Sequence, residues 1–178
     1  FPLLHRRKVF AEVENFRLYD FWSDGGFVDE NVFAYSNFFQ GHAALVVYNN
    51  RFGDSSGWIK QSAPYLVKDG NEGQLHQSDL ADALQLHGNH DDLVLFRDNN
   101  SKLWFLRKLG EIRERGMHFD LQAYSHQVLL DFQVVSGPQF NTLFEIYNGQ
   151  GIADLGGALE EIDFAPLLQP LRAVINPQ

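Results

Sequence analysis

Apolar and polar residues alternate in short runs over most of the chain, which is typical of β-strands joined by turns. The clearest stretch is residues 31–50, NVFAYSNFFQGHAALVVYNN, where the apolar runs Val32–Tyr35 and Ala43–Tyr48 flank the polar break Gln40–His42. Gly41 lies in that break and can adopt positive φ at no steric cost. This stretch therefore predicts a β-hairpin.

Two later segments repeat the strand pattern. Leu93–Phe96 and Leu103–Leu106 flank the polar turn Asp98–Ser101, so they predict a second hairpin. Met117–Tyr124 and Gln127–Val135 alternate apolar with polar residues and predict a third antiparallel pair.

The segments between these pairs carry weaker signals. Asn49–Lys60 and Lys68–Gly73 are polar and contain glycine, which predicts loops. Ser62–Val67 contains Pro64 and is expected to be an edge strand. His76–Leu86 has apolar residues at helical spacing and predicts a short amphipathic helix.

The hydrophobic period changes near the C-terminal end. Apolar residues follow helical spacing in 140–147, 152–162 and 166–175, which predicts three short helices. Strands followed by helices indicate a mainly β protein, an antiparallel β-sandwich with short α-helices at its C-terminal end. We expect a lead-in over 1–22 from an upstream segment, a β-sandwich over 23–137 and a helical tail over 138–178 packed on it.

Composition and charge narrow the function classes. The chain has 178 residues, 44% of them hydrophobic, and 16 phenylalanines, enough for a core of large rings. A formal net charge of −9 disfavours nucleic acid and anionic membranes as partners. The chain has no cysteine, which excludes disulfides and thiolate metal sites and favours the cytoplasm. It starts at Phe1 with the basic cluster HRRK at 5–8, so we expect it to be part of something longer.

Several polar clusters could carry chemistry, but each has a simpler interpretation. The acidic groups at 12–14, 91–92 and 160–163 could supply paired carboxylates, although neighbouring acids in an acidic chain usually form a solvated face. The histidines of HGNHDD at 87–92 could bind zinc, but a polar loop before a strand is the expected role. Ser125 and His126 are adjacent, which does not make a nucleophile and its base. We predict no catalytic residue, metal or cofactor.

Four aromatic residues are candidates for carbohydrate contact, because flat rings stack on the faces of sugars: Trp22, Trp58, Tyr65 and Trp104. Trp58 is the strongest of them, since it follows a glycine-containing stretch. Packing in the core is the commoner role of tryptophan, and both interpretations stay open at this point.

The stretch NVFAYSNFFQGHAALVVYNNRFGDSSGWIKQSAPYL at 31–66 resembles the C-terminal β domain, called domain C, of the α-amylase superfamily, glycoside hydrolase family thirteen. FDLQAYSHQVLLDF at 119–132 resembles its closing strands, and VENFRLYDF at 13–21 resembles the lead into it. The resemblance implies a Greek-key sandwich that follows a catalytic β/α barrel.

The family's catalytic Asp and Glu residues lie on the barrel, and no position here matches their motifs. The resemblance thus implies a non-catalytic accessory domain that stabilises a barrel, on the same or a separate chain, and contacts α-glucan. We expect Phe1, Leu3, Leu4, Val9 and Phe10 to contribute an apolar docking patch. The alternatives are an independent carbohydrate-binding module and an unrelated β-sandwich that binds other proteins.

Overall fold

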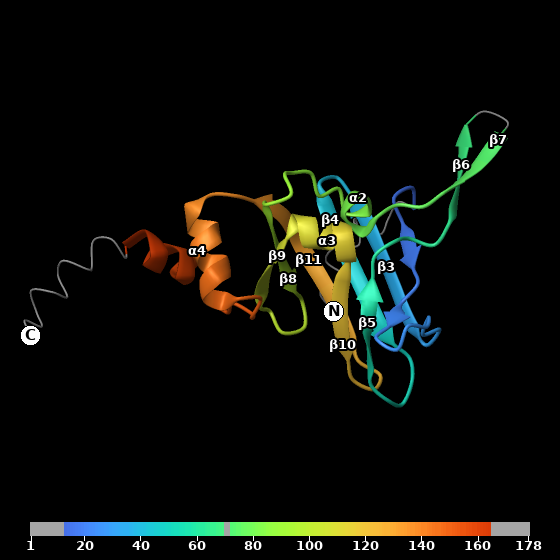
Figure 1. Ribbon diagram of the computed structural model, residues 1–178, viewed down its shortest axis with the longest axis horizontal. Coiled ribbons are helices and arrows are strands. Elements are labelled where there is room, and N and C mark those ends of the chain that lie inside the picture. The colour runs from blue at the N-terminus through green and yellow to red at the C-terminus, as the bar shows by residue number, and fades with distance from the viewer. Residues whose placement is uncertain (1–12, 70–71, 165–178) are drawn as a thin grey trace, which may run out of the picture.

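A computed structural model describes residues 13–69 and 72–164 of the chain, and these are mainly β (Figure 1). The strands are β1 (Arg17–Tyr19), β2 (Trp22–Ser23), β3 (Val32–Phe39), β4 (His42–Asn49), β5 (Ser55–Ile59), β6 (Tyr65–Asp69), β7 (Glu72–His76), β8 (Leu93–Asp98), β9 (Trp104–Lys108), β10 (Met117–Leu121) and β11 (His126–Val135). The helices are α2 (Leu80–Ala83), α3 (Leu109–Arg115) and α4 (Pro138–Tyr147), and residues 155–164 are also helical.

Within these residues the strands form two antiparallel sheets and a separate hairpin. The large sheet has six strands in the order β1-β3-β4-β11-β8-β9, and the small sheet has three in the order β10-β5-β2. Strands β6 and β7 pair with each other and project from the body of the molecule (Figure 1). The prediction of a mainly β protein with antiparallel sheets is confirmed.

The hairpin predicted over 31–50 is present as β3 and β4. Phe39 pairs with His42, which leaves a two-residue turn of Gln40 at φ 50° and Gly41 at φ 82°. Two successive positive φ angles match the twist of the flanking strands. Strands β3 and β4 also form the centre of one half of the large sheet, between β1 and β11.

The second predicted hairpin is present as β8 and β9, and Asp98 organises its turn. One carboxylate oxygen of Asp98 accepts the backbone N–H of Asn100 at 3.1 Å, and the other accepts the N–H and the hydroxyl of Ser101 at 3.1 and 2.7 Å. These bonds satisfy the buried carboxylate within its own turn.

The prediction that Met117–Tyr124 pairs with Gln127–Val135 is wrong. Strands β10 and β11 both exist, but β10 pairs with β5 in the small sheet, whereas β11 inserts between β4 and β8 in the large sheet. The loop predicted over Asn49–Lys60 is also wrong, since it contains β5. Sequence alternation locates strands but does not identify distant partners.

Two other local predictions need correction. The loop predicted over Lys68–Gly73 belongs mostly to the β6–β7 hairpin, and Tyr65 begins β6, so the edge strand starts after Pro64. The helix predicted over His76–Leu86 is only the turn α2, and no side chain caps its start. Without a cap and with so few residues, α2 depends on the burial of Leu80 in the core.

One hydrophobic cluster receives side chains from both sheets and from α2 and α3. Alternate residues of each strand contribute to it, as in Leu45 and Val47 of β4 and Phe119 and Leu121 of β10. Fully burying such a side chain contributes roughly 1.5–3 kcal/mol. The connector α3 leads directly from β9 of the large sheet to β10 of the small sheet, and Gly116 ends it at φ 81°.

The C-terminal helices cover the other face of β8 and β9. Leu93, Leu95 and Leu106 form a second cluster with Leu143 of α4 and Ile152, and side chains of the helix at 155–164 pack against it. The helices predicted over 140–147 and 152–162 are confirmed, the second of them from residue 155. The helix predicted over 166–175 lies outside the described residues, as does the patch predicted at Phe1, Leu3, Leu4, Val9 and Phe10. Among the described residues, no helix is both long and apolar enough to cross a membrane.

Candidate functional site

The outer face of the small sheet carries a row of three rings. Trp22 of β2 pairs with Trp58 of β5, and Trp58 pairs with His118 of β10. Paired residues in adjacent strands place their side chains on the same face of a sheet. Trp22 is 51% exposed, and the ring centroids of Trp58 and His118 lie 4.9 Å apart in an edge-on arrangement.

A polar row lies beside the rings on the same face. Ser56 of β5 pairs with Asp120 of β10, and Asp24 follows β2 directly. The Ser56 hydroxyl can donate to Asp24 Oδ2 at 2.8 Å or to Asp120 Oδ1 at 2.5 Å. His118 Nε2 lies 3.0 Å from Asp24 Oδ2, so this histidine joins the two rows.

His118 also sets the protonation of Asp24. The hydrogen bond from His118, followed by that from Ser56, lowers the pKa of the Asp24 carboxyl below its ordinary value. Both bonds are made to the charged carboxylate and therefore favour it. Asp24 is thus a hydrogen-bond acceptor on this face and not a proton donor.

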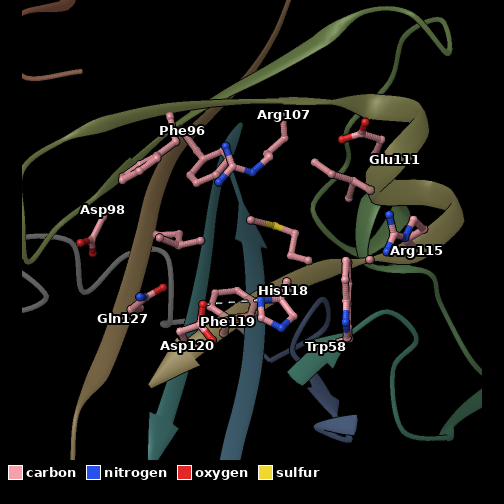
Figure 2. A pocket seen from close by; sticks show the side chains of 15 residues that line it. Trp58, Phe96, Asp98, Arg107, Glu111, Arg115, His118, Phe119, Asp120 and Gln127 are labelled. Atoms are coloured by element: carbon pink, nitrogen blue, oxygen red, sulfur yellow. Dashed lines mark ion pairs between the residues drawn. The ribbon is translucent and has the colours of Figure 1, made fainter. Parts of the chain in front are cut away.

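A cleft opens beside β10, the strand at one edge of the small sheet in the described part of the chain (Figure 2). It has a volume of about 360 Å³ and lies between β10, α3 and strands β8, β9 and β11. Phe96 and Phe105 stack in its wall with centroids 5.9 Å apart. Trp58, His118 and Asp120 line it as well, so the cleft and the outer face of the small sheet are continuous.

Two arginines reach this cleft from the connector region (Figure 2). Arg107 of β9 donates from one nitrogen to the carbonyls of Leu106 and Gly149, at 2.8 and 3.0 Å. Its partial burial lowers the pKa of the guanidinium, against the opposing effect of Glu111. Arg115, near the end of α3, lies over the Trp58 ring with its guanidinium carbon 4.7 Å from the ring centroid.

The polar row does not have the geometry of a hydrolytic triad. In such a triad one histidine nitrogen accepts the serine proton and a carboxylate holds the other nitrogen. Here His118 Nε2 faces both Asp24, at 3.0 Å, and Ser56 Oγ, at 3.3 Å, while Nδ1 lies 3.8 Å from Asp120. Ser56 donates to carboxylates instead of being activated by the imidazole.

The structure brings together two of the four predicted carbohydrate contacts. Trp22 and Trp58 share the outer face of the small sheet, as described above. Tyr65 lies in β6, and the guanidinium carbon of Arg17 is 3.7 Å from the centroid of its ring. The Tyr65 hydroxyl is 2.6 Å from Ser78 Oγ. Trp104 packs against the C-terminal cluster with Arg97 5.7 Å above its ring. Neither of these two rings joins the site.

Sequence reasoning missed the polar partners of the two tryptophans. His118 and Asp120 alternate with buried Met117, Phe119 and Leu121, which marks them as outward-facing residues of a strand. No local signal indicates that they lie beside Trp58, because that depends on the pairing of β10 with β5.

The other polar clusters stay separate from this site. His90 of the HGNHDD segment lies 3.0 Å from Glu114 and 3.4 Å from Asp91, and both hydrogen bonds raise its pKa, Glu114 the more strongly. No group of three potential metal ligands occurs in residues 13–69 and 72–164. Ser125 donates its hydroxyl to the carbonyl of Gln122 in the turn before β11, at 2.9 Å.

Comparisons with family models, with curated proteins and with solved structures give no match for this chain.

Proposed function

We propose that this chain is a non-catalytic accessory domain that contacts α-glucan, and that it works beside the catalytic barrel of an α-amylase-like glycoside hydrolase. The resemblance of 31–66 and 119–132 to domain C supports the proposed partnership with a catalytic barrel. The stretches that carry the resemblance include the paired strands β3 and β4. The two sheets share one hydrophobic cluster, which supports the proposal of a sandwich, and the Greek-key connectivity is proposed from the resemblance alone.

The observation that carries carbohydrate contact is the placement of Trp22 and Trp58 beside a row of hydrogen-bonding groups. A pyranose ring presents C–H groups on its faces, which pack on aromatic rings, and hydroxyls at its edge. Asp24, Ser56 and Asp120 line up next to the rings at hydrogen-bonding distances from one another. A sugar stacked on the tryptophans would therefore meet acceptors and donors at its edge.

The electrostatics of Asp24 exclude it as the acid of a glycosidase. A glycosidase needs two carboxyls, of which one keeps its proton through a raised pKa. Asp24, the carboxyl closest to His118, has a lowered pKa instead. Asp24 is therefore suited to accept hydrogen bonds from sugar hydroxyls and not to protonate a glycosidic oxygen.

Substitution of the tryptophans tests the proposal. We expect Trp22→Ala and Trp58→Ala each to weaken the binding of maltoheptaose by roughly tenfold, the loss of one stacked ring. Phe33→Ala is the matched control, because Phe33 is also 51% exposed but lies on β3. Isothermal titration calorimetry of the full chain provides the affinities, and folding is checked by circular dichroism. A wild-type chain that does not bind maltoheptaose or amylose would contradict the proposal.

The β6–β7 hairpin favours a second function, contact with another protein surface. It projects from the body (Figure 1), and Leu66 and Leu75 pair across it at 56% and 73% exposure. Exposed apolar pairs of this kind are common at protein interfaces. Under the proposed function the hairpin contacts the catalytic barrel and not the sugar. Leu75→Ser is therefore expected to leave the affinity for maltoheptaose unchanged. A loss of sugar affinity in this variant would instead place the hairpin in the sugar site.

A further inference from the structure

We infer that the cleft beside β10 binds a small organic carboxylate, whose charged group pairs with Arg107 while a flat apolar body packs on the floor of the cleft. This inference goes beyond the proposed function and does not depend on it, because it concerns a different kind of ligand. Two observations carry it. The cleft contains a half-buried cation without a counter-ion, and the surface next to that cation is aromatic and aliphatic.

Arg107 is the half-buried cation. It makes no ion pair with a carboxylate of residues 13–69 and 72–164. Burial lowers the pKa of its guanidinium, and this effect is larger than the opposing one of Glu111. Water therefore solvates the charge only in part, and no carboxylate replaces the lost water. Because charges removed from water are normally paired in proteins, an anionic group is the expected partner of Arg107.

The guanidinium of Arg107 is held in place and keeps one edge open. Its Nη1 donates to the carbonyls of Leu106 and Gly149, at 2.8 and 3.0 Å. Within the described part of the chain, Nε and Nη2 make no hydrogen bond, and neither atom is shielded from solvent. Figure 2 shows the side chain reaching into the cleft from β9. A carboxylate can accept from Nε and Nη2 with both of its oxygens, and little conformational entropy is lost because the side chain is already ordered.

The other charged groups of the cleft favour a ligand with a single negative charge. Glu111 and Arg115 are exposed, so water and salt screen their charges. The carboxylate of Asp98 is satisfied within its own turn, and Asp120 accepts a hydrogen bond on the outer face of the small sheet. These acids oppose a dianion such as phosphate more strongly than a monocarboxylate.

The floor of the cleft suits a flat apolar body. Phe96 and Phe105 stack with centroids 5.9 Å apart, and buried Ile112 and Met117 also line the cleft. The guanidinium carbon of Arg107 lies 5.9 Å from the centroid of the Phe105 ring, so the cation and the aromatic surface are adjacent. The volume of about 360 Å³ is at the lower end of the roughly 300–1,000 Å³ typical of small-molecule sites. A ring joined to a carboxylate by a short linker can therefore contact both.

Comparison of a carboxylate with its neutral amide tests this inference on the full chain. The probes are 3-phenylpropionate and 3-phenylpropanamide, which have the same shape and differ in charge. We expect the carboxylate to bind about tenfold more tightly, because only it forms a charge-assisted pair with Arg107. Inorganic phosphate has charge without an apolar body and should bind at least about tenfold more weakly than 3-phenylpropionate. Isothermal titration calorimetry provides the three affinities.

Arg107→Gln should reduce the preference for the carboxylate to about twofold or less. Arg97→Gln is the matched control, because Arg97 lies over Trp104 outside the cleft, and it should keep the full preference. If Arg107→Gln disturbs folding through the loss of its bond to Gly149, nuclear magnetic resonance of the wild-type chain still decides. The Nε–H signal of Arg107 should then shift with 3-phenylpropionate and not with its amide.

Three results would overturn the inference: no binding of 3-phenylpropionate, equal affinity for the carboxylate and the amide, or binding of phosphate as tight as that of the carboxylate. None of them bears on the contact of Trp22 and Trp58 with maltoheptaose. Failure of maltoheptaose to bind, in turn, would contradict the proposed function and leave this inference intact.

Discussion

His118 connects the groups of the candidate site at the residue scale. It lies edge-on to Trp58, 3.0 Å from Asp24 and 3.3 Å from Ser56, so it fixes the rings relative to the polar row. The bond to Asp24 is also the feature of the site that responds to pH. Because it stabilises a charged carboxylate in the folded protein, it links acidification to stability.

The lowered pKa of Asp24 predicts a specific loss of stability in acid. The contribution of Asp24 is fully present above the ordinary pKa of an aspartate and is lost as the pH falls through its lower folded value. We expect Asp24→Asn to flatten the decrease in free energy of unfolding between about pH 6 and pH 2, measured by urea denaturation.

Asp20→Asn provides the control, because Asp20 is exposed and lies outside the polar row. If the Asp24→Asn variant lost stability in acid as steeply as the wild-type chain, the bond between His118 and Asp24 would not contribute to the pH dependence of the free energy of unfolding. The carbon-13 titration of Asp24 checks the same point directly, with a midpoint expected below 3.8.

The residues of the site differ in how far the sequence could reveal them. Trp22 and Trp58 could be proposed as sugar contacts because flat rings stack on the faces of sugars, and Trp58 follows a glycine-containing stretch. Tyr65 and Trp104 carried the same signal, yet both rings lie elsewhere in the molecule, Tyr65 in β6 and Trp104 against the C-terminal cluster. His118 could not be placed beside Trp58 without knowledge of which strand pairs with β10.

At the element scale, the site depends on the pairing of β2 with β5, which places Trp22 beside Trp58. Gly57 of β5 pairs with Ser23 of β2, and a Cβ atom on Gly57 would collide with the carbonyl oxygen of Trp22 and approach a ring carbon of Phe21 to 2.7 Å. Glycine therefore permits the close approach that places Trp22 beside Trp58.

Gly57→Ala is accordingly expected to separate the two strands. Overpacking at a buried backbone contact costs roughly 1–3 kcal/mol in the free energy of unfolding, and displacement of Trp22 should weaken maltoheptaose binding as well. Gly41→Ala is the control, since Gly41 has a φ of 82° but open space around it. It should cost about 1 kcal/mol through backbone strain and leave sugar affinity unchanged. Urea denaturation and calorimetry measure both quantities, and unaltered binding by Gly57→Ala would show that Trp22 does not need this contact.

The same glycine explains why β5 was not predicted. The buried residues of this strand alternate as Ser55, Gly57 and Ile59, so the period of two is present but only Ile59 is apolar. Ser55 is buried because its hydroxyl donates to Asp29 at 2.9 Å, which no hydrophobicity pattern reveals. Hairpins with apolar strands and a glycine turn, such as β3 and β4, were predictable because every signal in them is local.

At the scale of the whole molecule, the large sheet separates two hydrophobic clusters. Val94 and Phe96 of β8 belong to the cluster shared with the small sheet, whereas Leu93 and Leu95 belong to the cluster under the C-terminal helices. Alternation along one strand thus supplies both faces. The site depends directly on the first cluster and is linked to the second through the bond from Arg107 to Gly149.

Two fully buried leucines allow the clusters to be tested separately. Leu45 lies in the cluster shared by the sheets and Leu143 in the C-terminal cluster, and both are 0% exposed. Each substitution by alanine should lower the free energy of unfolding by about 2–5 kcal/mol. We expect Leu143→Ala to increase hydrogen exchange mainly in α4 and the helix at 155–164, because the large sheet shields the small sheet from the cavity.

The sugar affinities should then differ between the two variants. Leu143→Ala loosens α4 and leaves the small sheet in place, so maltoheptaose should still bind to Trp22 and Trp58. Leu45→Ala loosens the support of the small sheet and should weaken the binding of maltoheptaose. If Leu143→Ala instead increased exchange throughout β2, β5 and β10, the two clusters would unfold as one unit, and the separation by the large sheet would have no energetic consequence.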